Sequence, residues 1–265
     1  MTESYRRARA IAIREIRSFF ASPIGWTVLS VFCLIAGLVF VGLLIRTRQA
    51  AITLAQTAGS RPGMPAGLHV SDWVVRPYLF NLGSVLLFFV PLLTMRSFAE
   101  ERRGGSLELL FSLPVRGVEL TLGKFGGGVL SMLSLLAIVP VHAAILGAVS
   151  RPDWAAAFAG LVGLVLLGCF MTAFGLLISA LSQSQIEAGV LTLGLFLLLG
   201  LGPGVAEAVS PAMARALGFV AVLSRFEDFT RGVIDLRHVA FFLGGTILAL
   251  ALTLRSLDLL RWRGV

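Results

Sequence analysis

The sequence predicts an all-α integral membrane protein that crosses the bilayer six times. The composition is 57% hydrophobic and only 14% charged, and the mean hydropathy is +0.92. The charged residues cluster between long apolar runs. A soluble domain carries about a quarter charged residues, so these charges are too few to cover a water-facing surface. We therefore expect a polytopic membrane chain.

The apolar runs place the membrane spans. Crossing the hydrocarbon core takes about 20 apolar residues in a helix, and a lipid-exposed backbone must satisfy its own hydrogen bonds. We expect the first run to be a retained anchor, because it is longer than the apolar core of a signal peptide. The predicted spans are residues 24–45, 78–95, 125–149, 154–181, 187–208 and 238–256.

The basic residues indicate topology. The net charge is +8, but the basic residues flank the spans, so we expect contact with lipid headgroups and no nucleic acid. In this topology thirteen Arg and Lys residues lie on the side of the termini and nine on the other, which predicts cytoplasmic termini. Cys33 and Cys169 lie far apart within spans, so neither a metal site nor a disulfide is expected.

Residues 1–23 are predicted to form an amphipathic helix at the membrane interface. Apolar side chains recur at helical spacing, and charged side chains take the opposite face. Ser22-Pro23 ends this helix. Anchoring in lipid and docking of a partner both remain open. The residues that we expect to matter are Arg14, Glu15, Arg17, Phe20 and Pro23. The next loop, residues 46–77, contains Pro62, Gly63, Pro65 and Gly67 and is predicted to be irregular and solvated.

The loop at residues 96–124 is the most informative segment. Four charges end the second span, a Gly-Gly pair breaks the helix, and a serine and a glutamate suit the start of a new short helix. Leucines give that helix an apolar face before a proline ends it. Such a helix is suited to the groove of another protein, although a loop that only sets topology has the same charges. The candidate residues are Glu100, Glu101, Arg102, Arg103, Gly105, Ser106, Glu108, Leu109, Leu110, Pro114 and Lys124.

Three motifs then carry a resemblance to a family. The loop reads EERRGGSLELLFSLPVRGVELTLGKF, the N-terminal segment reads REIRSFFASP, and the segment before the last span reads FEDFTRGVIDLR. Together they resemble the permease subunits of type-2 ABC exporters, especially the gliding-motility-associated branch. Ser106 stands where that family usually has threonine, and His238 stands where an acidic residue is common.

The resemblance implies a single permease domain, residues 1–265, with the fold of type V exporters. Such permeases have an interfacial helix, spans 1 and 2 (24–95), a coupling helix in the cytosolic loop (96–124), and spans 3 to 5 (125–208). A re-entrant outer segment (209–237) then precedes the last span and tail (238–265). A dimeric cytosolic ATPase would hold ATP and Mg, and this chain would hold no cofactor. A second permease copy or a paralogous membrane subunit would complete the complex in the bacterial cytoplasmic membrane.

The segment before the last span has its own charge pattern. On a helix, Glu227 and Arg231 are an i,i+4 pair, and Asp228 and Arg231 are an i,i+3 pair. Phe226 and Phe229 are predicted to face lipid or the partner protomer. The segment either gates an outer exit or only pins a turn. Its candidate residues are Phe226, Glu227, Phe229, Arg231, Gly232 and Asp235.

The function favoured is therefore the membrane subunit of an ATP-driven exporter. No G-x-x-x-x-G-K-[ST] motif occurs, so ATP hydrolysis is expected in a separate subunit and this chain is not expected to be an enzyme. An ion-coupled secondary transporter is the alternative, but His142 alone lies at membrane depth and no repeat is visible. His142 either lines a path or bonds to a neighbouring helix. An intramembrane enzyme would need paired carboxylates, a Ser/His pair or HExxH within spans, and none is present. The substrate is not identified.

Overall fold

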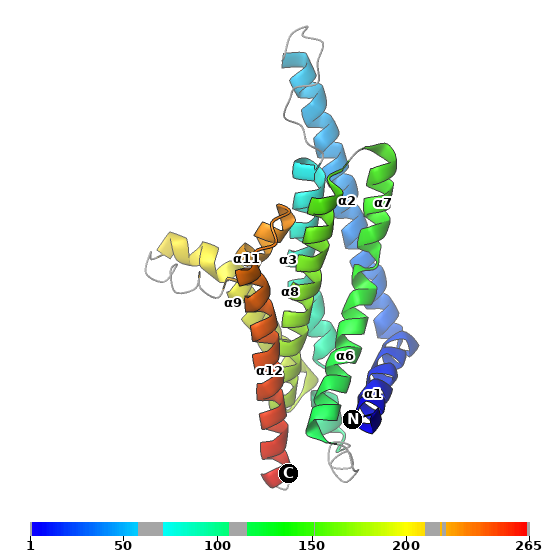
Figure 1. Ribbon diagram of the computed structural model, residues 1–265, viewed down its shortest axis with the longest axis vertical. Coiled ribbons are helices and arrows are strands. Elements are labelled where there is room, and N and C mark those ends of the chain that lie inside the picture. The colour runs from blue at the N-terminus through cyan, green and yellow to red at the C-terminus, as the bar shows by residue number, and fades with distance from the viewer. Residues whose placement is uncertain are drawn as a thin grey trace.

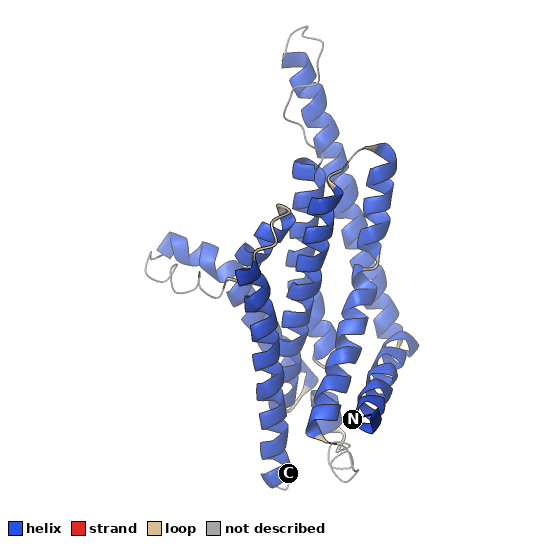
Figure 2. Cartoon of the chain, in the orientation of Figure 1, coloured by secondary structure: helices blue, strands red, loops and turns tan. Residues whose placement is uncertain are grey.

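The computed structural model describes residues 2–57, 71–105, 116–150, 152–209, 218 and 221–263, and within these ranges it contains helices and no strand (Figures 1 and 2). The helices run in chain order as α1 (Thr2–Ala21), α2 (Pro23–Thr57), the π-helix η1 (Ser71–Val75), α3 (Arg76–Thr94), α4 (Ala99–Arg103), α6 (Gly117–Leu136), α7 (Ile138–Val149), α8 (Trp154–Leu181), α9 (Gln185–Val209), α11 (Val222–Thr230) and α12 (Leu236–Arg263).

Five helical stretches are long and apolar enough to cross a membrane. They are Pro23–Thr53, Asp72–Arg103, Gly117–Val149, Trp154–Leu181 and Leu236–Leu260, and a shorter apolar stretch, Gln185–Gly200, lies within α9. The predicted multi-pass architecture is thus confirmed with five candidate spans among the described residues. Both ends of the helix predicted at 154–181 are confirmed by α8.

The first membrane helix continues well beyond its apolar run. The prediction of an irregular loop from residue 46 is wrong for residues 46–57, which belong to α2, and for residues 71–77, which belong to η1 and α3. The segment RTRQAAITLAQT contains neither glycine nor proline, so nothing in it ends a helix. The end of hydrophobicity therefore does not coincide with the end of the helix. The prolines and glycines at 62–67 lie outside the described residues.

The predicted third span is two helices. α6 begins at Gly117, inside the predicted loop 96–124, and the helix is interrupted at Ala137 before α7 begins. Pro140 lacks an N–H and so leaves the carbonyl of Leu136 without its usual partner, which accounts for a break at this place. The loop prediction is therefore wrong for residues 117–124.

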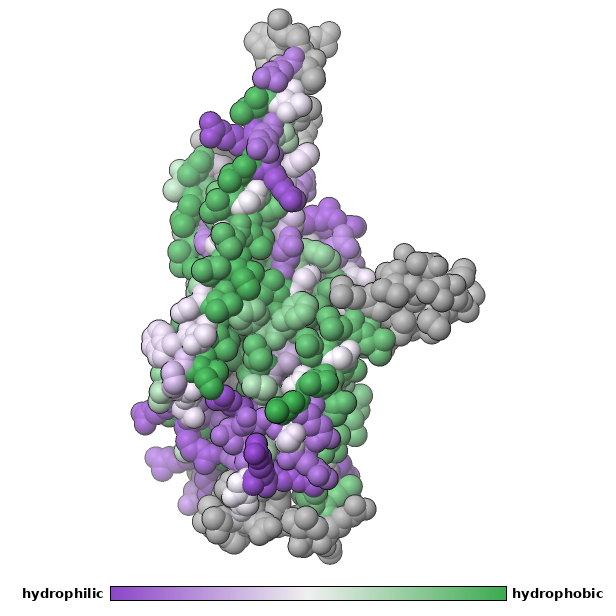
Figure 3. Space-filling model, turned by 180° about the vertical axis from the view of Figure 1, so that it is seen from behind, coloured by the Kyte–Doolittle hydropathy of each residue, from purple (hydrophilic) through white to green (hydrophobic). Residues whose placement is uncertain are grey.

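α8 is at the centre of the bundle. It packs against α12, α3, α11, α6 and α9, and its buried side includes Gly160, Gly163, Leu164, Leu167 and Phe170. Figure 3 shows, on one face of the molecule, a broad band of apolar side chains with polar side chains on both sides of it, most densely toward one end. This distribution fits a bundle that lipid surrounds at mid-height.

Both termini lie at the same end of the bundle, which we name the terminal end; the opposite end is the far end (Figure 1). α1 packs along α6 at the terminal end. The last turns of α9 point sideways out of the bundle (Figure 1), and α9 contains Pro203, a residue type that commonly kinks membrane helices. The predicted re-entrant segment falls partly on residues 210–217, 219 and 220, which lie outside the described residues.

Candidate functional site

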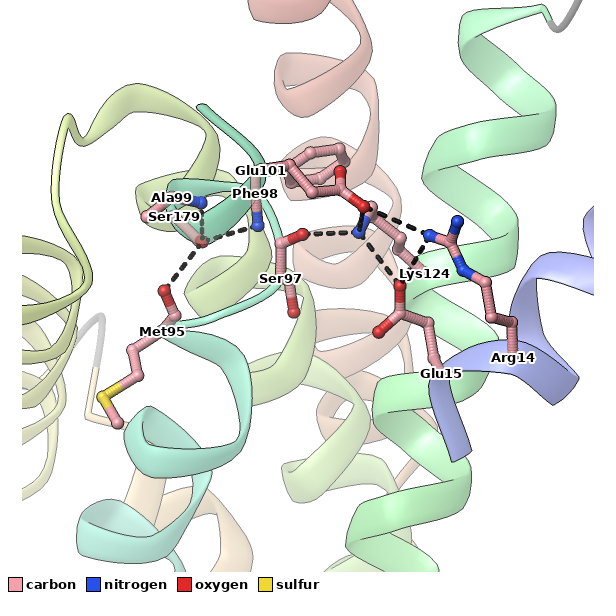
Figure 4. A network of polar contacts seen from close by, with 9 residues as sticks. All are labelled: Arg14, Glu15, Met95, Ser97, Phe98, Ala99, Glu101, Lys124 and Ser179. Atoms are coloured by element: carbon pink, nitrogen blue, oxygen red, sulfur yellow. Dashed lines mark hydrogen bonds and ion pairs between the residues drawn. The ribbon is translucent and has the colours of Figure 1, made fainter. Parts of the chain in front are cut away.

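A polar cavity of about 530 Å³ lies at the terminal end. α1, the start of α2, the end of α3, α4 and α6 all contribute to its walls. Figure 4 shows how the side chains of this region converge. The charged residues that line the cavity are Arg14, Glu15, Arg96, Glu100, Glu101 and Lys124.

Lys124 is the centre of this network. Its ammonium donates to Glu15 Oε1 at 3.0 Å and to the carbonyl oxygen of Ser97, and it lies 2.9 Å from Glu101 Oε1. The ring of Phe98 lies beneath the ammonium, at 5.0 Å from its centroid. The side chain is only 1% exposed. Lys124 therefore joins α6 to α1, to α4 and to the turn between α3 and α4.

The residue type at this position is informative. Lys124 is the single lysine of the chain, and every other basic residue except histidine is arginine. An ammonium is a compact charge with three N–H donors, whereas a guanidinium is a flat fork that needs more room. The three oxygens around Lys124 match the three donors. The buried geometry thus favours lysine over arginine.

Arg14 balances the charge of the network. Its guanidinium lies 3.1 Å from Glu101 Oε1 and 3.3 Å from Glu15 Oε1, so two cations face two carboxylates. A buried charge is tolerated when it is paired and hydrogen-bonded. Arg14 is 55% exposed, whereas Glu101 is 16% exposed, so the network extends from the interior to the surface.

Ser179 of α8 holds the turn that leads into α4. Its hydroxyl oxygen accepts from the backbone N–H groups of Phe98 at 3.0 Å and Ala99 at 3.2 Å, and it lies 3.3 Å from the carbonyl of Met95, to which it donates. The first N–H groups of a helix have no partner within the helix, so this serine replaces a local cap. α4 is thereby fixed to the core of the bundle.

α4 ends at the predicted glycine pair. Gly104 follows the last helical residue, and Gly105 has a φ of +68°, a conformation that glycine adopts without the cost that a Cβ imposes. Beyond it, Ser106, Glu108, Leu109, Leu110 and Pro114 lie outside the described residues, so the predicted coupling helix stays a prediction. Glu100 and Arg103 are exposed at the start of this loop.

Glycines on α6 bring α1 close. A Cβ at Gly123 would lie 2.7 Å from Ile11 Cβ and 2.9 Å from the carbonyl oxygen of Ala8, and a Cβ at Gly127 would overlap Glu15 Cβ. Small residues four apart let helix backbones approach closely. This contact explains why Glu15 reaches Lys124. Tyr5 of α1 is 70% exposed, whereas Ile11, Ala12 and Glu15, which lie against α6, are partly buried.

A second carboxylate, that of Glu119, joins α1 to α6 near the N-termini of both helices. Ser4 Oγ donates to Glu119 Oε1 at 2.6 Å, Arg7 lies 3.9 Å from Glu119 Oε2, and the N–H of Arg116 donates to the same oxygen at 3.2 Å. Glu119 is thus both the cap of α6 and a partner of α1. Neither Glu119 nor Ser179 was predicted to be a functional residue, because the role of each depends on contacts with residues that are distant in sequence.

The other candidate residues of the N-terminal helix lie near its end. Arg17 and Phe20 are exposed, and Pro23 is the first residue of α2. Phe20 packs edge-to-face on Trp26, with ring centroids 5.8 Å apart, and the Trp26 indole donates to the carbonyl of Phe20 at 2.8 Å. These two contacts fix the angle between α1 and α2. Arg102 of α4 is partly buried, and its guanidinium donates to the carbonyl oxygen of Leu181 at 3.5 Å.

At the far end, the predicted pair Glu227–Arg231 is confirmed. Both Arg231 and Arg76 donate to Glu227 Oε1 at 2.8 Å. The hydrogen bond from Arg76 and then that from Arg231 hold the pKa of Glu227 below its usual value. Asp228 lies 3.4 Å from His238 instead. α11 is thereby attached to α3 by charge.

The two phenylalanines of α11 face the core. The prediction that Phe226 and Phe229 face lipid or a partner is wrong, because both are fully buried. A Cβ at Gly83 or at Gly163 would lie 2.5 Å from Phe226 or from Phe229, respectively. These glycines on α3 and α8 leave room for the rings, which a sequence pattern alone does not reveal. Gly232, with a φ of +84°, ends α11, and Asp235 caps the next helix by accepting from Arg237 N at 2.8 Å.

His142 bonds to a neighbouring helix, which is one of the two alternatives for it. Its Nδ1 and the Tyr78 hydroxyl are 2.5 Å apart. The imidazole also stacks on Phe40, at a centroid distance of 4.6 Å and an angle of 9°.

Comparisons with known proteins give one family. Residues 9–258 match a family model described as ABC-2 family transporter protein. No curated protein matches the chain.

Proposed function

The chain belongs to the ABC-2 transporter family, and on that premise we propose that it couples ATP binding and hydrolysis in a separate ATPase to the export of a substrate. Membership makes it a multi-pass membrane subunit of an ABC transporter. The gliding-motility-associated branch and the substrate are not assigned by this membership, because a fold does not fix a cargo.

One observation carries the coupling proposal. Lys124 ties the segment that enters the loop 106–115 to α1 and α6 through Ser97, Glu101 and Glu15. A force applied to the loop from outside the membrane therefore reaches two helices at once. The buried charges resist being pulled apart, because separation leaves an uncompensated charge in a low-dielectric place. The network is thus suited to transmit movement of the loop into tilting of the bundle.

The arrangement of the whole subunit follows from this proposal. The loop would fit a cleft of a dimeric cytosolic ATPase that holds ATP and Mg. The terminal end would then face the cytoplasm. α9 would serve as a sixth span, and the residues between α9 and α11 would form a re-entrant segment at the outer face. A second copy, or a paralogous subunit, would form the other half of the pathway. Arg76, Glu227 and Arg231 would hold the outer segment in place.

The experiment is co-expression with the ABC ATPase encoded beside this chain, followed by affinity purification and reconstitution in vesicles. We expect a stable complex that hydrolyses ATP. Replacing Glu100, Glu101 and Leu109 with alanine together is expected to abolish the complex. Lys124→Gln is expected to leave the complex intact but to change its rate of ATP hydrolysis, because the residue is buried and cannot touch the partner.

Arg231→Gln is the matched control, because it also removes one member of an ion pair, at the opposite end of the bundle. It should leave the rate of ATP hydrolysis unchanged, whereas Lys124→Gln should change that rate. The proposal is wrong if the chain purifies without the ATPase and moves substrate in a proton gradient without ATP. That result would instead favour an ion-coupled secondary transporter.

A further inference from the structure

A second cavity lies toward the far end, between five elements. It has a volume of about 420 Å³, and its walls come from α2, η1, α3, α7 and α8. Apart from the indole of Trp154, the polar side chains among its lining residues are Tyr78 and His142. This size and this ratio of apolar wall to polar groups are typical of a site for a small molecule. The polar cavity at the terminal end is built of different residues.

The polar pair is buried and leaves one nitrogen for a ligand. Tyr78 is 4% exposed and His142 is 9% exposed. The phenol is the more acidic of the two groups, so its O–H donates to His142 Nδ1, which places the ring proton on Nε2. Among the described residues, no hydrogen bond is made by Nε2. It is therefore available as a donor to an oxygen inside the cavity.

The ring is held in one orientation. It is stacked on Phe40 and edge-on to Tyr78, with centroid distances of 4.6 Å and 5.5 Å. Such aromatic contacts fix a side chain beyond the effect of burial. The donor thus has a fixed direction, as a binding site requires.

The mouth of the cavity is apolar. Trp154 and Phe158, both on α8, line it and are 56% and 65% exposed. Trp154 is the first residue of α8, and the side chain of Asp153 caps that helix. Trp is enriched at the membrane–water interface, so the mouth would open to the bilayer just below its surface. An apolar cavity of this kind excludes water, and lipid chains are the molecules that surround it.

We propose that this cavity binds one lipid-like molecule, with its apolar chain against Phe40 and Leu161 and an acceptor oxygen hydrogen-bonded to His142 Nε2. The assignment goes beyond the proposed coupling role and does not depend on it, because it requires only a membrane-embedded chain. A free fatty acid carries both features and serves as the probe.

The test uses the full chain in vesicles that contain a fatty acid with a diazirine on its chain. After illumination, labelled residues are mapped by mass spectrometry. We expect label on the buried cavity residues Tyr78 and Val139, and we expect excess unlabelled fatty acid to remove it. Ile247 and Leu248 of α12, which are 68% and 56% exposed, should be labelled from bulk lipid in every sample and should not be protected.

Two variants separate filling of the cavity from loss of its donor. Ala157→Phe places a ring in the cavity and should abolish the protected label, whereas Ala251→Phe, on exposed α12, should not. His142→Phe keeps the stacking and removes the donor, so labelling should fall roughly three- to tenfold, as for one hydrogen bond.

Two results would overturn the assignment. In the first, Ile247 and Leu248 are labelled but Tyr78 and Val139 are not, so no lipid enters. In the second, the cavity label increases in proportion to the probe and unlabelled fatty acid does not compete, so there is no site. The wild-type competition is decisive even if a variant fails to fold. Neither result involves the ATPase, so the coupling proposal stands or falls separately.

Discussion

Lys124 Nζ in α6 lies 2.9 Å from Glu101 Oε1 in α4. The only lysine of the chain is thus paired with the helix that leads into the loop, and the same ammonium also contacts Glu15 of α1. Three segments that are far apart in sequence are joined at one atom.

Replacing Lys124 with methionine should destabilise the chain by about 3 kcal/mol, because two partly buried carboxylates lose their common partner. Lys124→Arg should not restore the stability, since a guanidinium does not fit the three oxygens that surround the ammonium. Thermal unfolding in detergent micelles measures both. If Lys124→Arg is as stable as the wild type, the ammonium geometry has no importance.

A double-mutant cycle with Lys124→Gln and Glu15→Gln should give a coupling energy of about 1–3 kcal/mol, because the two groups share a hydrogen bond in a region of low exposure. The same cycle with Lys124→Gln and Glu227→Gln is the control. Glu227 lies at the far end, so the two effects should add. Equal coupling in both cycles would contradict a direct interaction.

Gly127→Ala should push α1 away from α6, because the added Cβ would overlap Glu15 Cβ. We expect a loss of about 1–3 kcal/mol, typical of overpacking, and faster proteolysis of α1. Gly126→Ala is the matched control, since its Cβ would meet Ala12 Cβ at an ordinary 3.5 Å. Similar proteolysis of the two variants would show that α1 does not pack along this face of α6.

Phe229→Ala should destabilise the attachment of α11 by about 2 kcal/mol. The ring fills the space over Gly163, and in a membrane the loss is mainly one of packing, since lipid is as apolar as the ring. Val233→Ala is the control, because Val233 is 55% exposed. Unfolding monitored by a fluorophore on α11 would measure both. A larger effect for Val233→Ala, which lies in the turn after α11, would contradict the role of the buried Phe229 ring in holding α11.

Because Glu227 is paired, the free energy of unfolding should depend on pH at low pH. Its pKa is lowered in the folded state by Arg76 and Arg231, so its contribution is complete above the unfolded pKa of about 4.3 and is lost as the pH falls through the lower folded value. Wild type should therefore exceed Glu227→Gln in stability at pH 7, and the difference should shrink at pH 3. Added salt should reduce it too. A difference that is constant with pH would contradict the pairing.

Much of the secondary structure follows from the sequence. The helix at 154–181 and the break at Gly104-Gly105 were predictable, because apolar runs of membrane length and the φ of glycine are local properties. The pair Glu227–Arg231 was also predictable, because residues four apart share one face of a helix. The extension of α2 to Thr57 was missed, although its signal is local, because the prediction ended the helix where hydrophobicity ended.

The sequence by itself determined that this protein is a membrane bundle with a charged loop, since burial of apolar helices in lipid depends on composition and length. Tertiary structure decided that Lys124 is buried between α1, α4 and α6 and that Phe226 and Phe229 face inward. The reason is that the sequence reveals the apolar stripe of a helix, but it does not reveal which neighbouring helix covers that stripe. Here glycines of facing helices, at positions 123, 127, 83 and 163, open the space, and only the packed bundle brings each glycine opposite its partner.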